Sequence, residues 1–563
     1  MPSVEDPFRA FQIASLILLV AVALLRPMTF DRAFARFEGR LGQLAEAKRL
    51  HLVVVFVLAV GLRVVLLPLL GIRPPFVADE YSILMQARLM AMGKWSLPTD
   101  PLWPHFEEMH VIVQPVLAAI YFPGRSLPLT LGLLVFGQPW VGILLTMAAL
   151  ATAVTWMLQA WVRPLTALLG GILVILHLGL FSYWVNGYWG GAITALGATL
   201  LLGAAGRLAT GPRWTHGAWA AIGLFLLMTS RPYEGFMFCL GLGLALLPWL
   251  WRTLRARRFA QAARFIVPVL VAATMGAGVL MSHSAAISGD PLKPAYTVGR
   301  VQYGGAPPFL LLPPATEKIW SDAHLEKLYR WEATFHERAR SPDAYPQVLT
   351  TKISSLARFF LGPLLLLPFL FGFFARAPLW WLPTLAGGFV VLGFVVTTWD
   401  FPHYAAPLLP CAMIFVARGF ERLRAFAVAG RPAGLFLART LPVAMALSLL
   451  VPIGHLVVGV PAKVQDYSGV SCCNVLRTTA RGDLERALAE SGGRHLVFVR
   501  YDEGSERLTW VYNDPDLASA SIIWARDLGD ARNRELVARF PGRRVWLVVA
   551  RREQARILAY TPR

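Results

Sequence analysis

Uninterrupted apolar segments recur along this chain and constrain its fold more than any other feature. Examples are residues 51–72, 140–158, 164–181 and 440–460. A helix needs about 20 apolar residues to cross a hydrocarbon layer about 30 Å thick. Of the 563 residues, 56% are hydrophobic and 15% are charged, whereas soluble domains have roughly 25% charged residues. The sequence therefore predicts a mainly α fold, a polytopic transmembrane helical bundle.

The apolar segments divide the chain into three predicted domains. Residues 1–50 form an N-terminal helix and a cytoplasmic linker, residues 51–460 form the transmembrane bundle, and residues 461–563 form a small extracytoplasmic α/β domain. Two long outer loops, 73–138 and 282–354, interrupt the bundle. About twelve spans are expected at the length that a bilayer requires. They are 11–28, 51–72, 139–159, 164–182, 191–206, 216–230, 235–250, 265–281, 355–375, 379–397, 402–417 and 440–459.

The C-terminal segment has the pattern of a separate α/β domain. Runs of β-branched residues alternate with turn residues such as Gly492–Gly493, and Asp530 is placed to cap a helix. We expect a lid or docking function for this domain. The expected elements are helix 481–491, strands 495–501, 508–512 and 520–524, helix 531–540 and strand 544–549.

Basic residues are concentrated in one set of connecting loops. Residues 32–49, 252–264 and 418–439 are rich in arginine, whereas the short loops of the other set contain almost no lysine or arginine. Cytoplasmic loops of membrane proteins carry this excess of positive charge. The other set is therefore expected to face outward, into the periplasm if the protein lies in a bacterial inner membrane. The same rule accounts for the net charge of +20, so no nucleic-acid partner is predicted.

An acidic pair, Asp79–Glu80, follows the second expected span. Two carboxylates at the mouth of a membrane bundle can accept a proton or hold a cation, but acidic residues at a helix N-terminus can also simply face the helix dipole. Glu108 and His110 lie further along the same outer segment. Together the four residues are a candidate site for a divalent cation, Mg²⁺ or Mn²⁺, although their spacing is not diagnostic and a solvated loop is the simpler interpretation.

Other candidate residues fall at the outer ends of the expected spans. An aromatic and glycine-rich turn, 182–191, is typical of a membrane interface, but it also suits the face of a sugar. Arg231 is the one basic residue in the short outer turns, and its planar guanidinium suits phosphate. The candidate substrate wall is Tyr183, Asn186, Tyr188, Trp189 and Glu234, and the candidate phosphate ligands are Arg231, His403, Tyr404, Lys352 and Arg300.

The first outer loop resembles that of the C-type membrane glycosyltransferases, a superfamily that includes the protein O-mannosyltransferases and the lipid A aminoarabinose and galacturonic acid transferases. The resemblance rests on Asp79–Glu80–Tyr81, on Gln86–Ala87–Arg88, on the segment 93–98, on the Pro-Gly turn that follows Tyr121, and on His403–Tyr404 before a late span. It covers residues from about 51 to 420. An additional helix before the motif-bearing span and the C-terminal domain are departures from the best-known members.

The resemblance implies a sugar donor carried on a polyprenyl phosphate and an acceptor that is a lipid, a glycan or a protein. Asp79 would be the general base and Glu80 would orient the acceptor or bind the cation. The phosphate ligands would neutralise the leaving group, the product would be inverted, and loop 282–354 would close over the donor with the C-terminal domain. The alternative is a transporter or lipid flippase, for which the clearest ionisable residues inside spans are Arg63 and His177.

Overall fold

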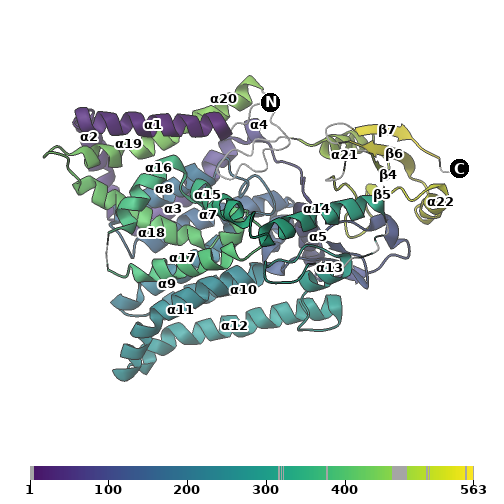
Figure 1. The fold of residues 1–563 in the computed structure, drawn as a ribbon, viewed down its shortest axis with the longest axis horizontal. Helices are drawn as coiled ribbons and strands as arrows, with labels where there is room; N and C mark the ends of the chain where they lie inside the picture. Colours follow the sequence, from purple (N-terminus) through teal and green to yellow (C-terminus); the bar gives the residue numbers. More distant parts are fainter. Residues whose placement is uncertain are drawn as a thin grey trace.

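The computed structural model describes residues 5–314, 318, 320, 322–375, 378–459, 478–502, 505, 508–551 and 555–561. The adjacent cysteines Cys472 and Cys473, for which the sequence suggests no role, lie outside these residues. The long helices run along the longest axis of the molecule, and the C-terminal sheet lies at one end of it (Figure 1). The protein is therefore a mainly helical bundle with a small α/β domain at one end.

Every expected span overlaps a helix, but the helices differ in their capacity to cross a membrane. In the described part of the chain, six helices are long and apolar enough, or seven if the bent pair α15–α16 counts as one span. Helices α8 and α17 are apolar but have only 15 residues each, and α3 carries three basic residues. The bundle helices are α1 (Glu5–Leu25), α3 (Lys48–Val65), α7 (Pro139–Leu158), α8 (Pro164–Leu178), α9 (Ala192–Gly206), α10 (Trp214–Ser230), α11 (Pro232–Arg255), α12 (Phe259–Ser288), α15 (Tyr345–Phe360), α16 (Gly362–Phe373), α17 (Trp381–Val395), α18 (Leu408–Ala425), α19 (Ala433–Ser448) and α20 (Leu450–Val458).

Small residues let neighbouring helices of the bundle approach closely. A Cβ atom added to Gly419 on α18 would lie 1.6 Å from the carbonyl oxygen of Pro368 on α16, and one added to Gly372 would lie 1.8 Å from that of Phe415. No side chain fits at either position. Close backbone contact through glycine is a common way for helices to pack in membranes, where the hydrophobic effect does not drive them together.

A bend of 94° separates α15 from α16. It falls at Gly362, whose φ of +57° is readily adopted only by glycine. The bend interrupts the helical hydrogen bonds, and His177 on α8 lies with its Nε2 atom 2.8 Å from the carbonyl oxygen of Phe359. This buried histidine therefore has a local structural partner.

Arg63, the clearest ionisable residue inside a span, also bonds to local partners through its Nε and Nη2 atoms. Its guanidinium donates two hydrogen bonds to Oδ1 of Asn186, at 3.2 and 2.8 Å, and one to the carbonyl of Gly71 at 3.1 Å. The same group lies 4.7 Å from the centre of the Trp140 ring. Arg63 thus connects α3 to the aromatic turn that precedes α9. Because this contact gives Arg63 a structural role, it weakens the transporter interpretation.

The outer loops contain structure that the sequence pattern did not reveal. The first loop forms a three-stranded sheet of order β1-β3-β2, and the apolar helix α6, whose outer face is exposed at Leu134 and Val135. Linker helix α2 is amphipathic and has Asp31 in its first turn. The elements outside the spans are α2 (Asp31–Ala45), α4 (Leu67–Leu70), α5 (Ala78–Ala91), β1 (Leu97–Pro98), β2 (Val111–Ile112), β3 (Val116–Ala119), α6 (Leu127–Phe136), α13 (Ala295–Tyr303) and α14 (Ala323–Arg340).

The C-terminal domain is a four-stranded mixed sheet of order β5-β4-β6-β7 with two helices. Strand β4 pairs in parallel with β5 and β6, and β7 pairs antiparallel with β6. The helix and strand expectations hold to within a few residues, except that the strand expected at 508–512 is wrong and β7 was not foreseen. The elements are α21 (Ala480–Glu490), β4 (His495–Tyr501), β5 (Ile522–Arg526), α22 (Asp530–Arg539), β6 (Arg544–Ala550) and β7 (Ala555–Ala559).

The segment 508–512 is not a strand because its backbone bonds to side chains instead of to the sheet. The Trp510 N–H donates to the Tyr501 hydroxyl at 2.9 Å, and the Val511 N–H donates to the Glu108 carboxylate at 3.4 Å. Glu108 belongs to the first outer loop. The segment is therefore part of the contact between the C-terminal domain and the bundle.

Candidate active site

Asp79 lies in the first turn of α5, and its side chain is partly exposed. The helix begins at Ala78, and the acidic residues of its first turn face the positive end of the helix dipole. The Asp79 side chain is 20% exposed, and its Oδ2 atom lies 3.8 Å from Nε2 of His110. Its Oδ1 atom accepts a hydrogen bond from the Tyr121 hydroxyl. His110 has a φ of +66°, a sparsely populated conformation of the kind that gathers at functional sites.

The surroundings keep Asp79 ionised. Burial alone would raise the pKa of its carboxyl, but His110, the Tyr121 hydroxyl, Arg125 and Arg300 together hold that pKa below its ordinary value of 3.8. The group is therefore a carboxylate at neutral pH. It can accept a proton or stabilise a positive charge.

Glu80 faces the other way and is fully buried. Its carboxylate pairs with Arg73 and accepts backbone N–H bonds from Phe76 at 2.8 Å and Tyr188 at 2.9 Å. Adjacent residues on a helix do not share a face, so only one member of the acidic pair can point toward His110. The expectation that Glu80 orients an acceptor or binds a cation is not supported by these contacts, which tie α5 to the turn before α9.

Replacing Glu80 with glutamine should destabilise the protein. The change would leave the Arg73 guanidinium, which is 4% exposed, facing a neutral amide, and loss of one partner of a buried ion pair costs about 3–5 kcal/mol. We expect a lower midpoint of thermal unfolding in detergent or nanodiscs. Glu326→Gln, which disrupts an exposed pair with Arg330 on α14, is the control and should change the midpoint little. Equal midpoints for both variants would contradict the structural role of Glu80.

The four residues suggested as a cation site do not come together. In the described part of the chain, no three His, Cys, Asp or Glu side chains gather in a group that could hold a metal. Glu80 is engaged by Arg73, and Glu108 accepts a hydrogen bond from the Tyr501 hydroxyl at 2.9 Å, which leaves Asp79 and His110 as neighbours. The arrangement of these side chains therefore does not match the predicted set of cation ligands. A requirement for Mg²⁺ or Mn²⁺ stays a prediction from the sequence.

The aromatic turn 182–191 packs behind the acidic pair. The Tyr188 hydroxyl donates to the carbonyl of Arg73 at 3.1 Å, and Asn186 accepts from Arg63. Tyr183 and Trp189 are 3% and 6% exposed and contact each other, with ring centres 5.7 Å apart. These four residues are buried in the packed interior and do not line the large cavity described next, so their part in a substrate wall stays a prediction.

A cavity of about 700 Å³ is lined in part by Tyr121, whose hydroxyl donates a hydrogen bond to Asp79. It is built from four segments that are far apart in sequence: the turn before α6, the α10–α11 turn, α13 with the loop that follows it, and the α17–α18 turn. Three arginines and one glutamate are among its lining side chains, and most of the rest are aromatic or aliphatic. The charged and aromatic lining residues that matter below are Tyr121, Arg125, Arg231, Glu234, Tyr296, Arg300, Trp399 and Tyr404.

The arginines of this cavity have unused hydrogen-bond donors. Arg231 pairs with Glu234 at 2.8 Å, and Arg300 pairs with Glu332 at 2.6 Å. In the described residues, the Nε and Nη2 atoms of Arg231, the Nε atom of Arg300 and the Nε1 atom of Trp399 are buried without a hydrogen-bond partner. Buried donors without partners are costly. These donors belong to side chains that line the cavity, and the three guanidinium groups gathered there suit a ligand with several acceptor oxygens.

Positive charge is crowded at the same place. Burial lowers the pKa of the Arg125 guanidinium, and the nearby Arg231 lowers it further. Arg125 lies 4.3 Å from the centre of the Tyr121 ring, and Arg231 lies 4.5 Å from that of Tyr404. An anion would relieve the repulsion between the two guanidinium groups. The apolar part of the lining would accept a hydrocarbon chain.

Three of the five predicted phosphate ligands line this cavity, namely Arg231, Arg300 and Tyr404. Lys352 does not, because its ammonium is buried and donates to the carbonyls of Phe394, at 3.0 Å, and Thr397. These bonds hold the backbone at the end of α17, close to Trp399, and the ammonium does not line the cavity.

His403 also lies outside the lining. It is 1% exposed, its Nδ1 atom lies 3.1 Å from the Tyr183 hydroxyl, and it stacks on Phe401. It is a packing residue behind Tyr404.

The sequence did not identify Arg125, Tyr296 and Trp399 as site residues. Arg125 follows the Pro-Gly turn after Tyr121, and its position in the first outer loop was the available signal. Trp399 lies in the same short outer turn as His403 and Tyr404, which was the available signal, whereas Tyr296 reaches the cavity only through the packing of α13. Glu234, predicted as a substrate-wall residue, does line the cavity as the partner of Arg231.

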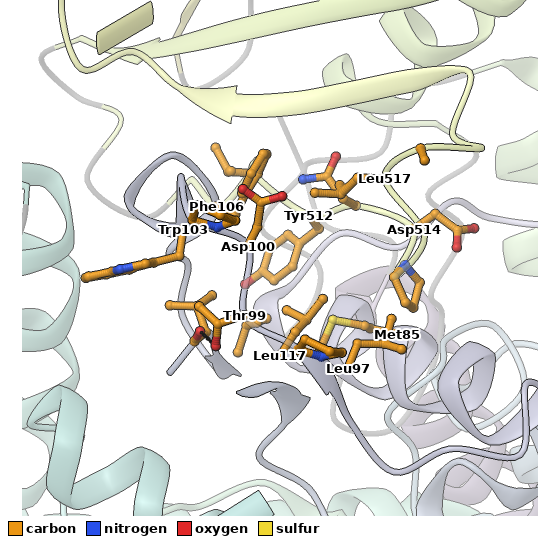
Figure 2. A pocket seen from close by; sticks show the side chains of 18 of the residues that line it. Met85, Leu97, Thr99, Asp100, Trp103, Phe106, Leu117, Tyr512, Asp514 and Leu517 are labelled. Atoms are coloured by element: carbon orange, nitrogen blue, oxygen red, sulfur yellow. Dashed lines mark hydrogen bonds between the residues drawn. The ribbon is translucent and has the colours of Figure 1, made fainter. Parts of the chain in front are cut away.

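A second cavity, of about 340 Å³, lies between the first outer loop and the C-terminal domain. Figure 2 shows Met85, Leu97 and Leu117 on one side of it and Phe106, Tyr512 and Leu517 on the other. Arg526 closes the same contact region, where it pairs with Asp322 at 3.0 Å and approaches Glu108 at 3.6 Å. Arg526 is 1% exposed. The C-terminal domain is thus joined to the bundle through buried charged groups.

Comparisons with known proteins give matches at the level of structure. No family model matches the chain, and a search of curated proteins finds no match. The apo oligosaccharyltransferase of Archaeoglobus fulgidus has a TM-score of 0.44 and 10% identity, covering 89% of this chain and 69% of that one. Apo ArnT from Cupriavidus metallidurans has a TM-score of 0.43 and 13% identity, covering 88% and 92%.

A further similar structure is the archaeal oligosaccharyltransferase AglB from Archaeoglobus fulgidus in complex with an inhibitory peptide and a dolichol-phosphate. Its TM-score is 0.39, with 10% identity over 88% of this chain and 69% of that one. The chain is similar in structure to these three proteins. At these identities the similarity concerns the fold alone, and no residue of the site is assigned through it.

Proposed function

We propose that this protein is a glycosyltransferase that moves a sugar from a polyprenyl-phosphate donor to an acceptor hydroxyl on the extracytoplasmic face of the membrane. The observation that carries the proposal is the arginine-rich cavity with unused donors beside an ionised Asp79. Transfer from a lipid-linked donor needs a cation at the leaving phosphate and a base near the acceptor. The cavity and Asp79 meet these two needs.

The donor phosphate would bind to Arg125, Arg231 and Arg300. Guanidinium groups offer planar donors that match phosphate oxygens, and the buried N–H groups of Arg231 and Arg300 provide them here. The polyprenyl chain would lie against the apolar lining. As the bond between the sugar and the phosphate oxygen breaks, negative charge grows on the phosphate, and these fixed positive charges stabilise the transition state.

Asp79 would take the acceptor proton. In a single displacement the acceptor oxygen forms a bond to the anomeric carbon while the bond to the phosphate oxygen breaks, and the proton passes to the Asp79 carboxylate. The products are an inverted glycoside and a free polyprenyl phosphate. One carboxylate is sufficient as a base, which agrees with Glu80 being engaged by Arg73.

The transporter alternative has less support in the structure. Arg63 and His177 are bonded within the bundle, and the unused donors of the large cavity gather beside one set of loops. The orientation of that set toward the periplasm follows from the positive-inside rule.

The proposal is tested by measuring transfer in lipid nanodiscs. Purified protein would be incubated with polyprenyl-phosphate sugars carrying a radiolabelled sugar, with membrane extract as the acceptor. We expect label to reach the acceptor from lipid-linked donors and not from nucleotide sugars. Absence of transfer from a broad donor set, together with movement of a labelled lipid across proteoliposomes, would replace the transferase with a flippase.

A further inference from the structure

Tyr512 of the C-terminal domain contacts both segments that hold the candidate base. Its ring stacks on that of Tyr81, with centres 4.4 Å apart and planes 3° from parallel. Its hydroxyl donates to the carbonyl of Met109 at 2.7 Å. Tyr81 follows Asp79 by two residues, and Met109 directly precedes His110. One side chain therefore links the two segments whose side chains meet at Asp79 and His110.

Arg481 of α21 fixes this arrangement. It is 6% exposed, and it donates to the Tyr81 hydroxyl at 3.1 Å and to the carbonyls of Trp510 and Tyr512 at 3.0 and 2.9 Å. Its guanidinium also lies 4.7 Å from the centre of the Tyr81 ring. A buried, fully bonded arginine sets the relative position of the groups around it.

Helix α5 depends on such contacts for its orientation. Most of its residues are buried, so no exposed face distinguishes one rotation from another by hydrophobicity alone. A rotation of one residue would turn each side chain by about 100°, and Asp79 would no longer face His110. The polar contacts at Tyr81, together with those at Glu80, select the observed rotation.

We infer that the C-terminal domain positions Asp79 for catalysis. Tyr512 and Arg481 hold α5 and the Met109–His110 segment at the separation where the Asp79 carboxylate can receive the acceptor proton. Tyr512 and Arg481 are positioning residues that act through Tyr81 and Met109. This inference rests on the proposed function for its kinetic consequences, whereas the mechanical coupling itself can be measured without any substrate.

The test uses Tyr512→Phe, which removes the bond to Met109 and keeps the stack on Tyr81. We expect kcat to fall roughly fivefold, as for loss of one neutral hydrogen bond, with the KM for the donor unchanged because the arginine cavity is not touched. Tyr560→Phe is the matched control. Its hydroxyl bonds to Asp530 and to Asn533, 2.5 and 3.0 Å away and both within the C-terminal domain, so kcat should stay at the wild-type value.

The pH profile adds a readout that a general loss of stability would not change. His110, Tyr121, Arg125 and Arg300 hold the pKa of Asp79 below 3.8, against the effect of burial. Transfer requires the ionised form, so wild-type activity should persist into the acid range in which an ordinary aspartate becomes protonated. Loosening the contact with His110 raises the pKa of Asp79, and the acid limb of Tyr512→Phe should move to higher pH.

Hydrogen exchange separates this inference from the proposed function. In the intact protein, the amides of residues 78–91 and 107–113 should exchange faster in Tyr512→Phe and in Arg481→Gln than in the wild type or Tyr560→Phe. Unchanged exchange in both segments would overturn the inference, even if the transferase activity is real. If no donor supports transfer but exchange increases as expected, the coupling stands and the proposed function fails.

Discussion

Asp79→Asn should reduce sugar transfer by about 10²- to 10⁴-fold, the usual contribution of a general base. The amide preserves the shape of the side chain but cannot accept the acceptor proton. Binding of the donor should persist, because the three arginines of the cavity are unchanged. The measurement is single-turnover transfer in nanodiscs, with donor binding measured separately on the same preparation.

Asp343→Asn is the matched control for this result. Asp343 is exposed in the turn before α15, and its replacement should leave both transfer and donor binding unaltered. The midpoint of thermal unfolding of Asp79→Asn should stay close to that of the wild type, in contrast with Glu80→Gln. Full activity of Asp79→Asn would exclude Asp79 as the base.

The second large effect is expected at Arg231. The variant to use is Arg231→Gln combined with Glu234→Gln, because Arg231 alone would leave a buried carboxylate without its partner. Charge-assisted hydrogen bonds contribute about 1.5–3 kcal/mol each, so the Kd for the donor should rise roughly ten- to hundredfold. Titration of a fluorescent polyprenyl-phosphate analogue into nanodiscs measures it.

A matched pair lies on α14. Arg330 and Glu326 form an exposed pair at 2.9 Å, with side chains 59% and 43% exposed, and their joint replacement by glutamine removes the same charges. We expect no change in donor affinity from this control. An equal loss of affinity in both double variants would mean that overall charge, and not the cavity, governs binding.

The sequence was sufficient to separate the apolar spans from the loops that connect them. A bilayer requires apolar spans and favours basic residues in the cytoplasmic loops. Both requirements can be read directly from the amino-acid sequence. Arg231 was singled out in this way, because the short outer turns contain almost no other basic residue, whereas Arg300 was taken from the long outer loop 282–354 and Tyr404 from the family resemblance. The C-terminal helices and most strands also carry local signals.

The roles of individual residues were not predictable to the same degree. Whether Asp79 or Glu80 faces His110 depends on which side of α5 meets Arg73, and the two residues differ by only one position in their distance from the span. Lys352 has the chemistry of a phosphate ligand, but its ammonium donates hydrogen bonds to the carbonyls of Phe394 and Thr397 at the end of α17. The segment 508–512 has β-branched and aromatic residues typical of a strand, and the side chains of Tyr501 and Glu108 compete for its backbone.

The contact between Arg481 and Tyr81 joins residues 400 positions apart. A ribosome completes α5 long before it reaches α21, and the intervening helices must be inserted in the meantime. Throughout that interval α5 lacks its contacts with Tyr512 and Arg481, although Glu80 can already bond to Arg73 and Tyr188. The order of synthesis therefore makes the coupling between α5 and α21 one of the last contacts to form.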